Sequence, residues 1–352
     1  MNNLLEVKNL NTSFHIGVGT VQAVRGISFH IGEGESVGIV GESGSGKSVT
    51  MLSVMGLLPN YAEIRADSIL FDGREMTAMS ARQLRAMHGS EIGMIFQDPM
   101  TSLNPLFTVE KQLTEPLRIH MKMGRSEARS RALELLRQVD IPNPEARLKQ
   151  YPHELSGGLR QRVMIAIAIS CGPKMVIADE PTTALDVTIQ AQILELLEHL
   201  KDTTKTSIIM ITHDLGVIAS MCSRILVMYG GIICEEGSAR EIFYDPKHPY
   251  TWGLLNSIPK TTGSREEKLI PINGTPPDML MPPRGCPFAP RCRYCMPVCR
   301  EFMPPRTRLG DTHAVSCHLM HPKAPKVQGR RTIQPSVPPV SPGAGTNDDR
   351  EV

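Results

Sequence analysis

The sequence predicts an α/β fold built around a parallel β-sheet. Residues 161–235 alternate between helical and extended patterns: RVMIAIAIS, then MVIAD, then IQAQILELLEHL, then SIIMITHD. Strand–helix–strand alternation at this spacing is typical of parallel sheets. A second observation is a glycine-rich loop that lies between the apolar run 36–40 and the periodic stretch 49–58. This order indicates a further strand–loop–helix unit.

Composition narrows the class of protein. The 352 residues are enough for two or three domains, and an apolar share of 41% can form a sizeable core. The 38 Lys and Arg against 36 Asp and Glu, with 4% aromatics, give no reason to expect a nucleic-acid partner. No secretory signal is visible, and the longest apolar stretch, 163–169, is far shorter than the ~20 residues that span a bilayer. We therefore expect a soluble cytosolic chain that reaches a membrane only through partners.

The elements follow in chain order. Residues 1–40 alternate short apolar runs with glycine-rich turns, which predicts several short strands. Residues from about 98 to 160 have helical spacing, most clearly at Leu133, Leu135, Leu136 and Val139. Residues 246–310 are rich in proline and are expected to be mostly loops. Residues 321–352, rich in Pro, Gly and Ser and without periodicity, are expected to be disordered.

A phosphate-binding loop is predicted at residues 41–48. GESGSGKS fits the pattern G-x-x-x-x-G-K-[ST] in the strand–loop–helix context that the motif needs. Its glycines let backbone N–H groups turn inward around an anion, and the helix N-terminus adds a favourable dipole. Lys47 is predicted to contact the β- and γ-phosphates, and Ser48 to bind Mg²⁺. The full predicted set is Gly41, Ser43, Gly44, Ser45, Gly46, Lys47, Ser48 and Val49.

A second element supports nucleotide chemistry. MVIADE is an apolar strand that ends in two acids, Asp179 and Glu180. Asp179 is predicted to hold Mg²⁺, usually through water. Glu180 is predicted to act as general base or to orient water for hydrolysis.

The stretch LSGGLRQ at 155–161 closely resembles the signature motif of ATP-binding cassette (ABC) ATPases, and the family's other motifs occur in the family's order. Gln97 in IFQDP resembles the Q-loop glutamine, and Asp186 in ALD lies where the family has its D-loop. His213 in ITHD resembles the switch histidine, and Phe14 matches an aromatic that stacks on adenine. The resemblance covers residues 1–240.

This resemblance implies a P-loop NTPase core with an N-terminal antiparallel β subdomain and a helical subdomain at about 98–160. It implies that Gln97 senses Mg²⁺ and water, and that His213 contacts the γ-phosphate. The signature precedes an apolar helix, so it is a second helix N-terminus suited to a phosphate. In the family two cassettes pack head to tail, so one chain's ATP meets the other chain's Ser156, Gly157, Gly158 and Gln161.

Longer motifs resemble a subfamily. FQDPMTSLNP at 96–105, YPHE at 151–154, HPYT at 248–251 and GCPFAPRC at 285–292 are similar to those of oligopeptide and dipeptide importer ATPases, which include nickel-uptake relatives. The resemblance thus extends to about residue 320.

It implies an ATP-hydrolysing subunit of a di- or oligopeptide importer, peripheral at the cytoplasmic face of the inner membrane. The implied partners are a second ATPase subunit, identical or related, two transmembrane permeases and, indirectly, an extracytoplasmic solute-binding protein. The alternatives are import of nickel or another small solute, a soluble ABC ATPase without transport, and a redox- or metal-sensing protein.

Five of the eight cysteines crowd into 286–317 with the spacing C-x5-C-x2-C-x3-C-x17-C. In a reducing cytosol, thiolates at such spacing favour a metal over disulfides, and zinc or a four-iron four-sulfur cluster each needs four of them. Spacing does not choose between the two, and a site without metal also stays open. In the subfamily, cysteines matching Cys286, Cys292, Cys299 and Cys317 are associated with a four-iron four-sulfur cluster, which leaves Cys295 as a spare or alternative ligand. Residues 241–320 would then form a small Cys-rich extension, while Cys171, Cys222 and Cys234 are expected to be buried.

Overall fold

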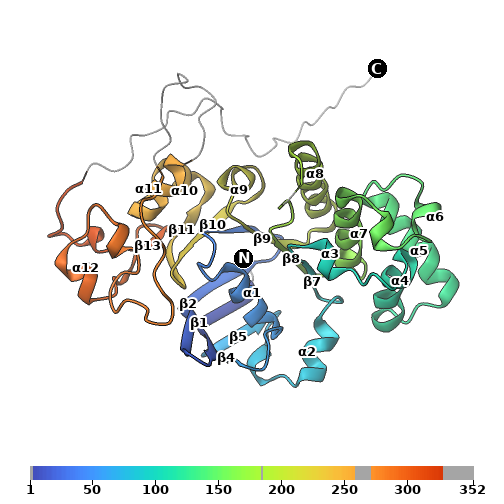
Figure 1. The fold of residues 1–352 in the computed structure, drawn as a ribbon, viewed down its shortest axis with the longest axis horizontal. Helices are drawn as coiled ribbons and strands as arrows, with labels where there is room; N and C mark the ends of the chain where they lie inside the picture. The colour runs from blue at the N-terminus through green and yellow to red at the C-terminus, as the bar shows by residue number, and fades with distance from the viewer. Residues whose placement is uncertain (1–2, 184, 258–270, 328–352) are drawn as a thin grey trace, which may run out of the picture.

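The structure is a computed structural model that describes residues 3–183, 185–257 and 271–327. Two β-sheets form its centre, with helices at one end and the C-terminal segment at the other (Figure 1). The larger sheet has the order β12-β13-β11-β10-β3-β9-β8-β7, parallel from β10 to β7 and antiparallel elsewhere. The predicted parallel sheet is therefore confirmed. Its strands are β3 (Ser36–Val40), β7 (Ile92–Ile95), β8 (Met175–Asp179), β9 (Ser207–Thr212), β10 (Arg224–Tyr229), β11 (Ile232–Ser238), β12 (Arg306–Arg308) and β13 (Ala314–Ser316).

The smaller sheet is antiparallel and has the order β2-β1-β5-β6, with β4 paired to β1. The prediction of several short strands before β3 is wrong, because two long strands of 14 residues each form this region. Asn9 and Gly26, residue types that favour turns, lie inside these strands at positive φ. The pairing of β1 with β2 shifts register beside Asn9. Such bulges bend a strand without ending it. The strands are β1 (Asn3–Ile16), β2 (Gly19–Gly32), β4 (Ala62–Arg65), β5 (Ser68–Phe71) and β6 (Arg74–Glu75).

Helices fill the region that was predicted to be helical. They are α3 (Pro99–Ser102), α4 (Val109–His120), α5 (Arg125–Gln138), α6 (Pro144–Arg147) and α7 (Gly157–Ile169), and they gather on the right of Figure 1. Leu135, Leu136 and Val139 are fully buried, and Leu133 is partly buried against the same core. The remaining helices are α1 (Lys47–Met55), α2 (Ala81–Met87), α8 (Val187–Thr204), α9 (Leu215–Met221), α10 (Ala239–Tyr244), α11 (Pro249–Asn256) and α12 (Pro297–Glu301).

The two faces of the main sheet belong to two hydrophobic cores. Alternate residues of β8 and β9 divide between them, since Ile177 and Ile209 pack with the antiparallel sheet and α1, whereas Ala178 and Met210 pack with the helical side. Both faces of the parallel strands are thus covered, as their continuous apolar sequence requires.

The three scattered cysteines differ in burial. Cys222 and Cys234 are buried as expected. Cys171 is only partly buried, because it follows the end of α7 and precedes the turn at Gly172.

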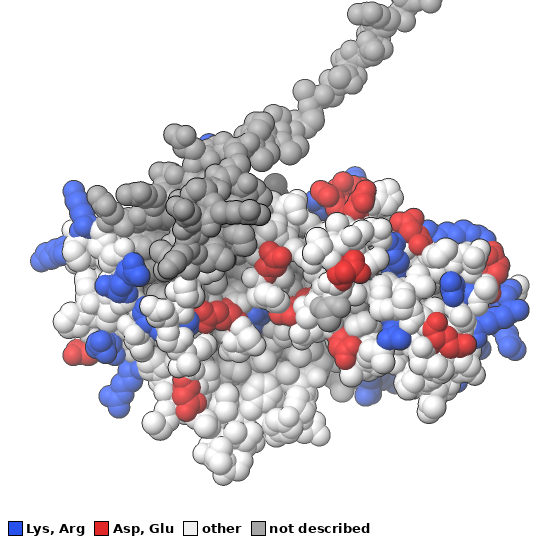
Figure 2. All heavy atoms as spheres, turned by 45° about the horizontal axis from the view of Figure 1, so that its top comes forward, with Lys and Arg blue, Asp and Glu red and all other residues white. Residues whose placement is uncertain are grey.

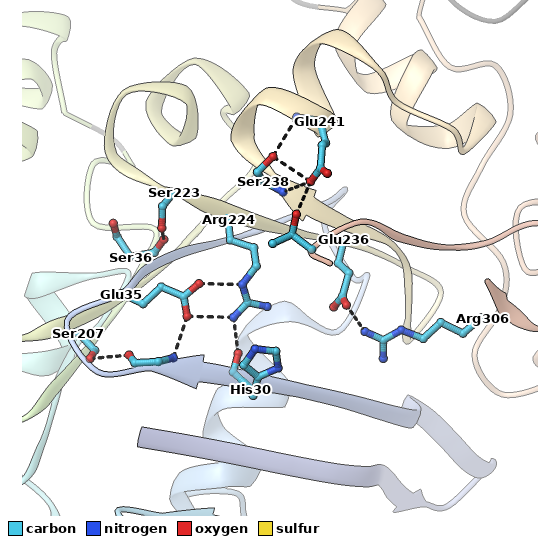
Figure 3. A network of polar contacts seen from close by, with 12 residues as sticks. His30, Glu35, Ser36, Ser207, Ser223, Arg224, Glu236, Ser238, Glu241 and Arg306 are labelled. Carbon is cyan, nitrogen blue, oxygen red and sulfur yellow. Dashed lines mark hydrogen bonds and ion pairs between the residues drawn. The ribbon is translucent and has the colours of Figure 1, made fainter. Parts of the chain in front are cut away.

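A polar network fastens the antiparallel sheet to the main sheet (Figure 3). The Arg224 guanidinium on β10 donates to both carboxylate oxygens of Glu35, at 2.7 and 3.0 Å, and to the carbonyl of His30 at the end of β2. Ser207 on β9 donates to the carbonyl of Gly32 at 3.1 Å. The start of β3, which leads to the glycine-rich loop, is therefore held from two neighbouring strands.

The C-terminal segment adds to the main sheet instead of standing apart from it. Strand β13 pairs with β11, and the Arg306 side chain on β12 forms an ion pair with Glu236 on β11 (Figure 3). Sequence patterns did not reveal these strands. Of the tail expected to be disordered, residues 328–352 lie outside the described residues.

On the face shown in Figure 2, Lys and Arg side chains gather at the two ends of the molecule, with Asp and Glu between and among them. Among the helices that the structure describes, none is both long and apolar enough to cross a membrane.

Candidate functional site

Four predicted motifs meet at the carboxyl ends of neighbouring parallel strands. The glycine-rich loop follows β3, the acidic pair ends β8, and His213 and Gln97 follow β9 and β7. Ligands in open parallel sheets bind at this edge.

The loop at 41–46 requires glycine at two points. Gly41 and Gly46 have positive φ values of 156° and 100°. A Cβ on Gly41 would lie 2.2 Å from the carbonyl oxygen of Met228, and one on Gly46 would lie 2.6 Å from that of Ala23. The loop is thus pressed against β10 and β2, and its backbone leads directly into α1.

Lys47 is buried within this loop, where its ammonium donates to the carbonyls of Gly41 and Glu42 at 2.8 and 3.0 Å. Burial lowers the pKa of Lys47, although nearby acids act in the opposite direction. The Ser45 hydroxyl is buried and has no hydrogen-bond partner among the described residues. An ammonium, an unpaired hydroxyl and a helix N-terminus in one loop are donors that fit a polyphosphate.

Ser48 and Asp179 are brought together from α1 and β8. The Ser48 hydroxyl donates to the Asp179 carboxylate at 2.8 Å. Burial raises the pKa of Asp179, and Glu180 adds to this effect, while Ser48 and Lys47 oppose it. Hard oxygen donors of this kind, one carboxylate and one hydroxyl, suit Mg²⁺ held together with phosphate oxygens.

Glu180 lies at the centre of the predicted catalytic residues. Its carboxylate accepts from the Gln97 amide and the Thr183 hydroxyl, each at 2.9 Å, and lies 3.3 Å from Nδ1 of His213. Its backbone is left-handed with φ of 46°, which is unusual for a side chain of this type. The sequence did not point to Thr183, although its place three residues after Glu180 would have put it within reach across a turn.

Phe14 lies on β1, beside the strand that packs on the loop. Its pairing partner on β2 is Val21, two residues before Ala23. The ring of Tyr61, which belongs to no motif recognised in the sequence, lies 6.0 Å from that of Phe14 between centroids. One exposed ring, Tyr61, and one partly exposed ring, Phe14, are therefore available on this side.

The signature is placed apart from the loop within this chain. It lies at the start of α7, among the helices on the right of Figure 1, whereas α1 lies in the middle. Ser156 caps α7 by accepting from the Leu159 N–H at 3.4 Å, and Asp186 caps α8 by accepting from the Ile189 N–H at 3.0 Å. The amide nitrogen of Gln161 is buried without a partner among the described residues. Gly157 and Gly158 form the first turn of α7.

Four of the five clustered cysteines share one pocket. Its lining includes Cys286, Cys292, Cys299 and Cys317, together with His248 and His318, but not Cys295. Burial raises the pKa of Cys286 and Cys317 to about 12 and that of Cys292 to about 11. Within the described ranges, however, no group of three or more His, Cys, Asp or Glu side chains is arranged to hold a metal ion. The iron–sulfur cluster that the sequence predicts is therefore not shown by these side chains and stays a prediction.

Comparison with known proteins agrees with these motifs. The ABC transporter family model matches residues 24–183, and the model for the C-terminal region of oligopeptide/dipeptide transporters matches residues 234–299. The oligopeptide transport ATP-binding protein OppD of Bacillus subtilis is 54% identical over 94% of this chain and 93% of its own length. The dipeptide transport ATP-binding protein DppD of the same organism is 53% identical over 92% of this chain and 97% of its own length.

Solved structures confirm the predicted fold. The ATP-binding cassette MJ0796, solved as a dimer with ADP and phosphate, superimposes with a TM-score of 0.60 at 29% identity. The match covers 67% of this chain and 99% of that cassette. With these matches and the motifs above, the chain belongs to the family of ATP-binding proteins of oligopeptide and dipeptide ABC transporters.

Proposed function

We propose that this chain hydrolyses ATP to drive the import of di- and oligopeptides, at the cytoplasmic face of the inner membrane. The observation that carries the ATPase is the meeting of Lys47, Ser48, Asp179 and Glu180 at one sheet edge. Peptide import is supported by relatives whose names specify oligopeptide or dipeptide transport over nearly the whole chain.

In the proposed site the loop binds the triphosphate. Apart from the N–H of Glu42, which donates to Tyr250, the backbone N–H groups of the loop would bind the phosphates. Lys47 would leave the loop carbonyls to contact the β- and γ-phosphates. Mg²⁺, when bound, neutralises charge on the phosphates. Ser48 and Asp179 are the residues that would hold it, Asp179 usually through water. Phe14 would stack on adenine, and Tyr61 lies close enough to share that role.

For hydrolysis, Glu180 accepts a proton from the attacking water. Gln97 and Thr183 donate to one carboxylate oxygen, and His213 lies against the other. These contacts hold the carboxylate in one orientation. His213 and Gln97 would turn toward the γ-phosphate and Mg²⁺ when the nucleotide separates them from Glu180.

A complete site would need two chains. Ser156 and the two glycines after it are exposed or partly exposed at the N-terminus of α7. A helix N-terminus is suited to bind a phosphate, and here that phosphate would belong to the ATP bound by the loop of a second chain. The second ATPase subunit is either another copy or a related chain. Two transmembrane permeases would receive the motion through the helices at about 98–160, and a solute-binding protein would deliver peptide from outside.

The test is peptide-driven ATP hydrolysis in the complete transporter. The chain is purified with its permeases and partner ATPase, reconstituted in liposomes, and assayed with peptides or with nickel. We expect di- or oligopeptides, delivered by the binding protein, to raise ATP hydrolysis and to accumulate across the membrane. Stimulation by nickel but not by any peptide would favour the alternative solute. ATP hydrolysis with no membrane partner would favour a soluble ATPase.

For the cysteine pocket we propose a four-iron four-sulfur cluster with a structural role. The support is that Cys286, Cys292, Cys299 and Cys317 line one pocket, which gives four thiols where such a cluster needs four. Cys295 does not line this pocket, and its thiol lies 3.6 Å from the Met296 carbonyl. Anaerobically purified protein should contain iron and sulfide and absorb near 400 nm. Cys317→Ser should lose them, and Cys295→Ser should keep them. Stoichiometric zinc without iron would contradict the cluster.

A further inference from the structure

The C-terminal segment contacts the phosphate loop through one side chain. The Arg291 guanidinium donates to both carboxylate oxygens of Glu42, at 2.6 and 3.1 Å. Glu42 is the second residue of the loop, 249 positions away in the chain. Only 6% of the Arg291 side chain and 25% of the Glu42 side chain are exposed. A two-point contact between buried guanidinium and carboxylate is strong and directional.

Arg291 is itself fixed from several sides. Its remaining N–H groups donate to the carbonyls of Asn273 and Ile272, at 2.9 and 3.0 Å, and to the Tyr229 hydroxyl at 3.1 Å. These contacts fix the position of the guanidinium. Its ion pair with Glu42 therefore restrains the loop.

Glu42 is also held at its backbone. Its N–H donates to the Tyr250 hydroxyl at 2.8 Å, and its carbonyl accepts from Lys47 at 3.0 Å. The rings of Tyr229 and Tyr250 lie 4.5 Å apart between centroids, and Phe288 packs on both. The residue that touches Lys47 thus rests on an aromatic cluster, one ring of which, Phe288, comes from the C-terminal segment.

The contact also has an electrostatic consequence. Without Arg291, the Glu42 carboxylate would place an unpaired negative charge in the loop that must accept a triphosphate. Like charges at short range repel strongly where water is excluded. Arg291 neutralises this charge. The electrostatic potential in the loop is then set mainly by its N–H groups and by Lys47, which attract a triphosphate.

We propose that Arg291 is a positioning residue of the ATP site: it holds and neutralises Glu42, so that nucleotide affinity depends on the C-terminal segment being folded against the loop. This inference rests on the proposed binding of ATP by residues 41–48. Arg291 ends a short 3-10 helix, Ala289–Arg291, between Cys286 and Cys292. Whatever orders the cysteine pocket therefore also orders Arg291.

The test measures the affinity of the full-length chain for a non-hydrolysable ATP analogue with Mg²⁺, and its melting temperature in parallel. Arg291→Met should weaken binding about 10-fold, because it leaves the largely buried Glu42 carboxylate unpaired in the loop that accepts the phosphates. Arg291→Lys keeps the charge but loses the two-point contact, so its loss should be smaller. Adding Glu42→Gln to Arg291→Met should restore most of the affinity, because it removes the repelling charge. A role limited to packing would give no such restoration.

Arg306→Met is the matched control. It removes two other contacts of the same segment, the ion pair with Glu236 (Figure 3) and the hydrogen bond to the Ser28 carbonyl. Neither contact involves the phosphate loop. It should lower the melting temperature and leave nucleotide affinity unchanged. Equal weakening by Arg306→Met and Arg291→Met would overturn the proposal, as would unchanged affinity in Arg291→Met or no restoration by Glu42→Gln.

Lys47→Ala separates this inference from the proposed function. If Lys47→Ala abolishes binding but Arg291→Met does not change it, only the role of Arg291 fails. If the wild-type chain does not bind the analogue, or Lys47→Ala binds it equally well, the ATP site itself is misplaced and both proposals fail.

Discussion

Ser48 and Asp179, which are 131 positions apart, share a hydrogen bond of 2.8 Å at the start of α1. This contact fixes two oxygen atoms at the distance from which both can serve one small cation. Ser48→Ala should therefore weaken nucleotide binding about 10-fold or more with Mg²⁺ present, a typical cost of removing a group that holds a metal. In EDTA the variant should bind nucleotide like the wild type. Fluorescence titration with a labelled ATP analogue in the two buffers measures the difference.

Ser53→Ala is the control for this experiment. Its hydroxyl lies on the same helix but bonds to the Val49 carbonyl and to Thr12, not to an acid. Its affinity should match that of the wild type in both buffers. An equal loss for Ser48→Ala with and without Mg²⁺ would assign Ser48 to the phosphates instead of the metal.

Glu180→Gln should retain binding of MgATP and lose hydrolysis by about 10²- to 10⁴-fold, the usual contribution of a general base. The amide keeps the shape of the side chain and can still meet Thr183 and Gln97, so the site should stay folded. Steady-state phosphate release and nucleotide binding are measured on the same preparation. Glu198→Gln, on the exposed face of α8, should hydrolyse ATP at the wild-type rate. Near-normal ATP turnover in Glu180→Gln would show that Glu180 is not the general base.

The sequence predicts those parts of the site that are local in the chain. The loop at 41–48 and the pair Asp179 and Glu180 are contiguous patterns whose residue types carry the chemistry. The strands β8 and β9 are likewise predicted, because their apolar runs are continuous and bounded by turns. Local patterns also misled, as at Asn9 and Gly26, where turn-forming residues became bulges within long strands.

Contacts between distant segments could not be predicted. Gln97 meets Glu180 across 83 positions, and Arg291 meets Glu42 across 249. Neither Arg291 nor Glu42 belongs to a motif whose chemistry requires the other. Strand β13, which joins the same C-terminal segment to β11, has three residues, too few for its pattern to be recognised in the sequence.

Glu75 should make stability depend on pH. Burial alone would raise the pKa of its carboxyl, but hydrogen bonds from Ser68, Thr77 and Ile69 outweigh it and lower the pKa to about 2. A carboxyl with a lowered pKa in the folded state stabilises above the unfolded value of 4.5, and this contribution is lost as the pH falls toward 2. Glu75→Gln should therefore melt below the wild type at pH 6, and the gap should narrow as the pH falls to 3. Thermal unfolding across this range measures it.

Glu33→Gln, at an exposed position, is the control for loss of a surface carboxylate. It should melt close to the wild type at pH 6. If the difference in melting temperature between Glu75→Gln and the wild type stays constant from pH 6 to pH 3, Glu75 stabilises the fold through its hydrogen-bond geometry and not through its charge.

Ser156→Arg should separate nucleotide binding from hydrolysis. Ser156 is exposed at the start of α7, apart from the phosphate loop of the same chain. The substitution removes a helix cap, which costs about 1 kcal/mol of stability, and places a bulky side chain where a second chain's nucleotide would lie. The purified chain should therefore bind the ATP analogue as tightly as the wild type, whereas the reconstituted transporter should lose most of its ATP hydrolysis. Ser126→Arg, exposed on α5 outside the motif, should keep both. If Ser156→Arg weakens binding by the isolated chain as much as Lys47→Ala does, the signature acts on the nucleotide of its own chain and the two-chain site is wrong.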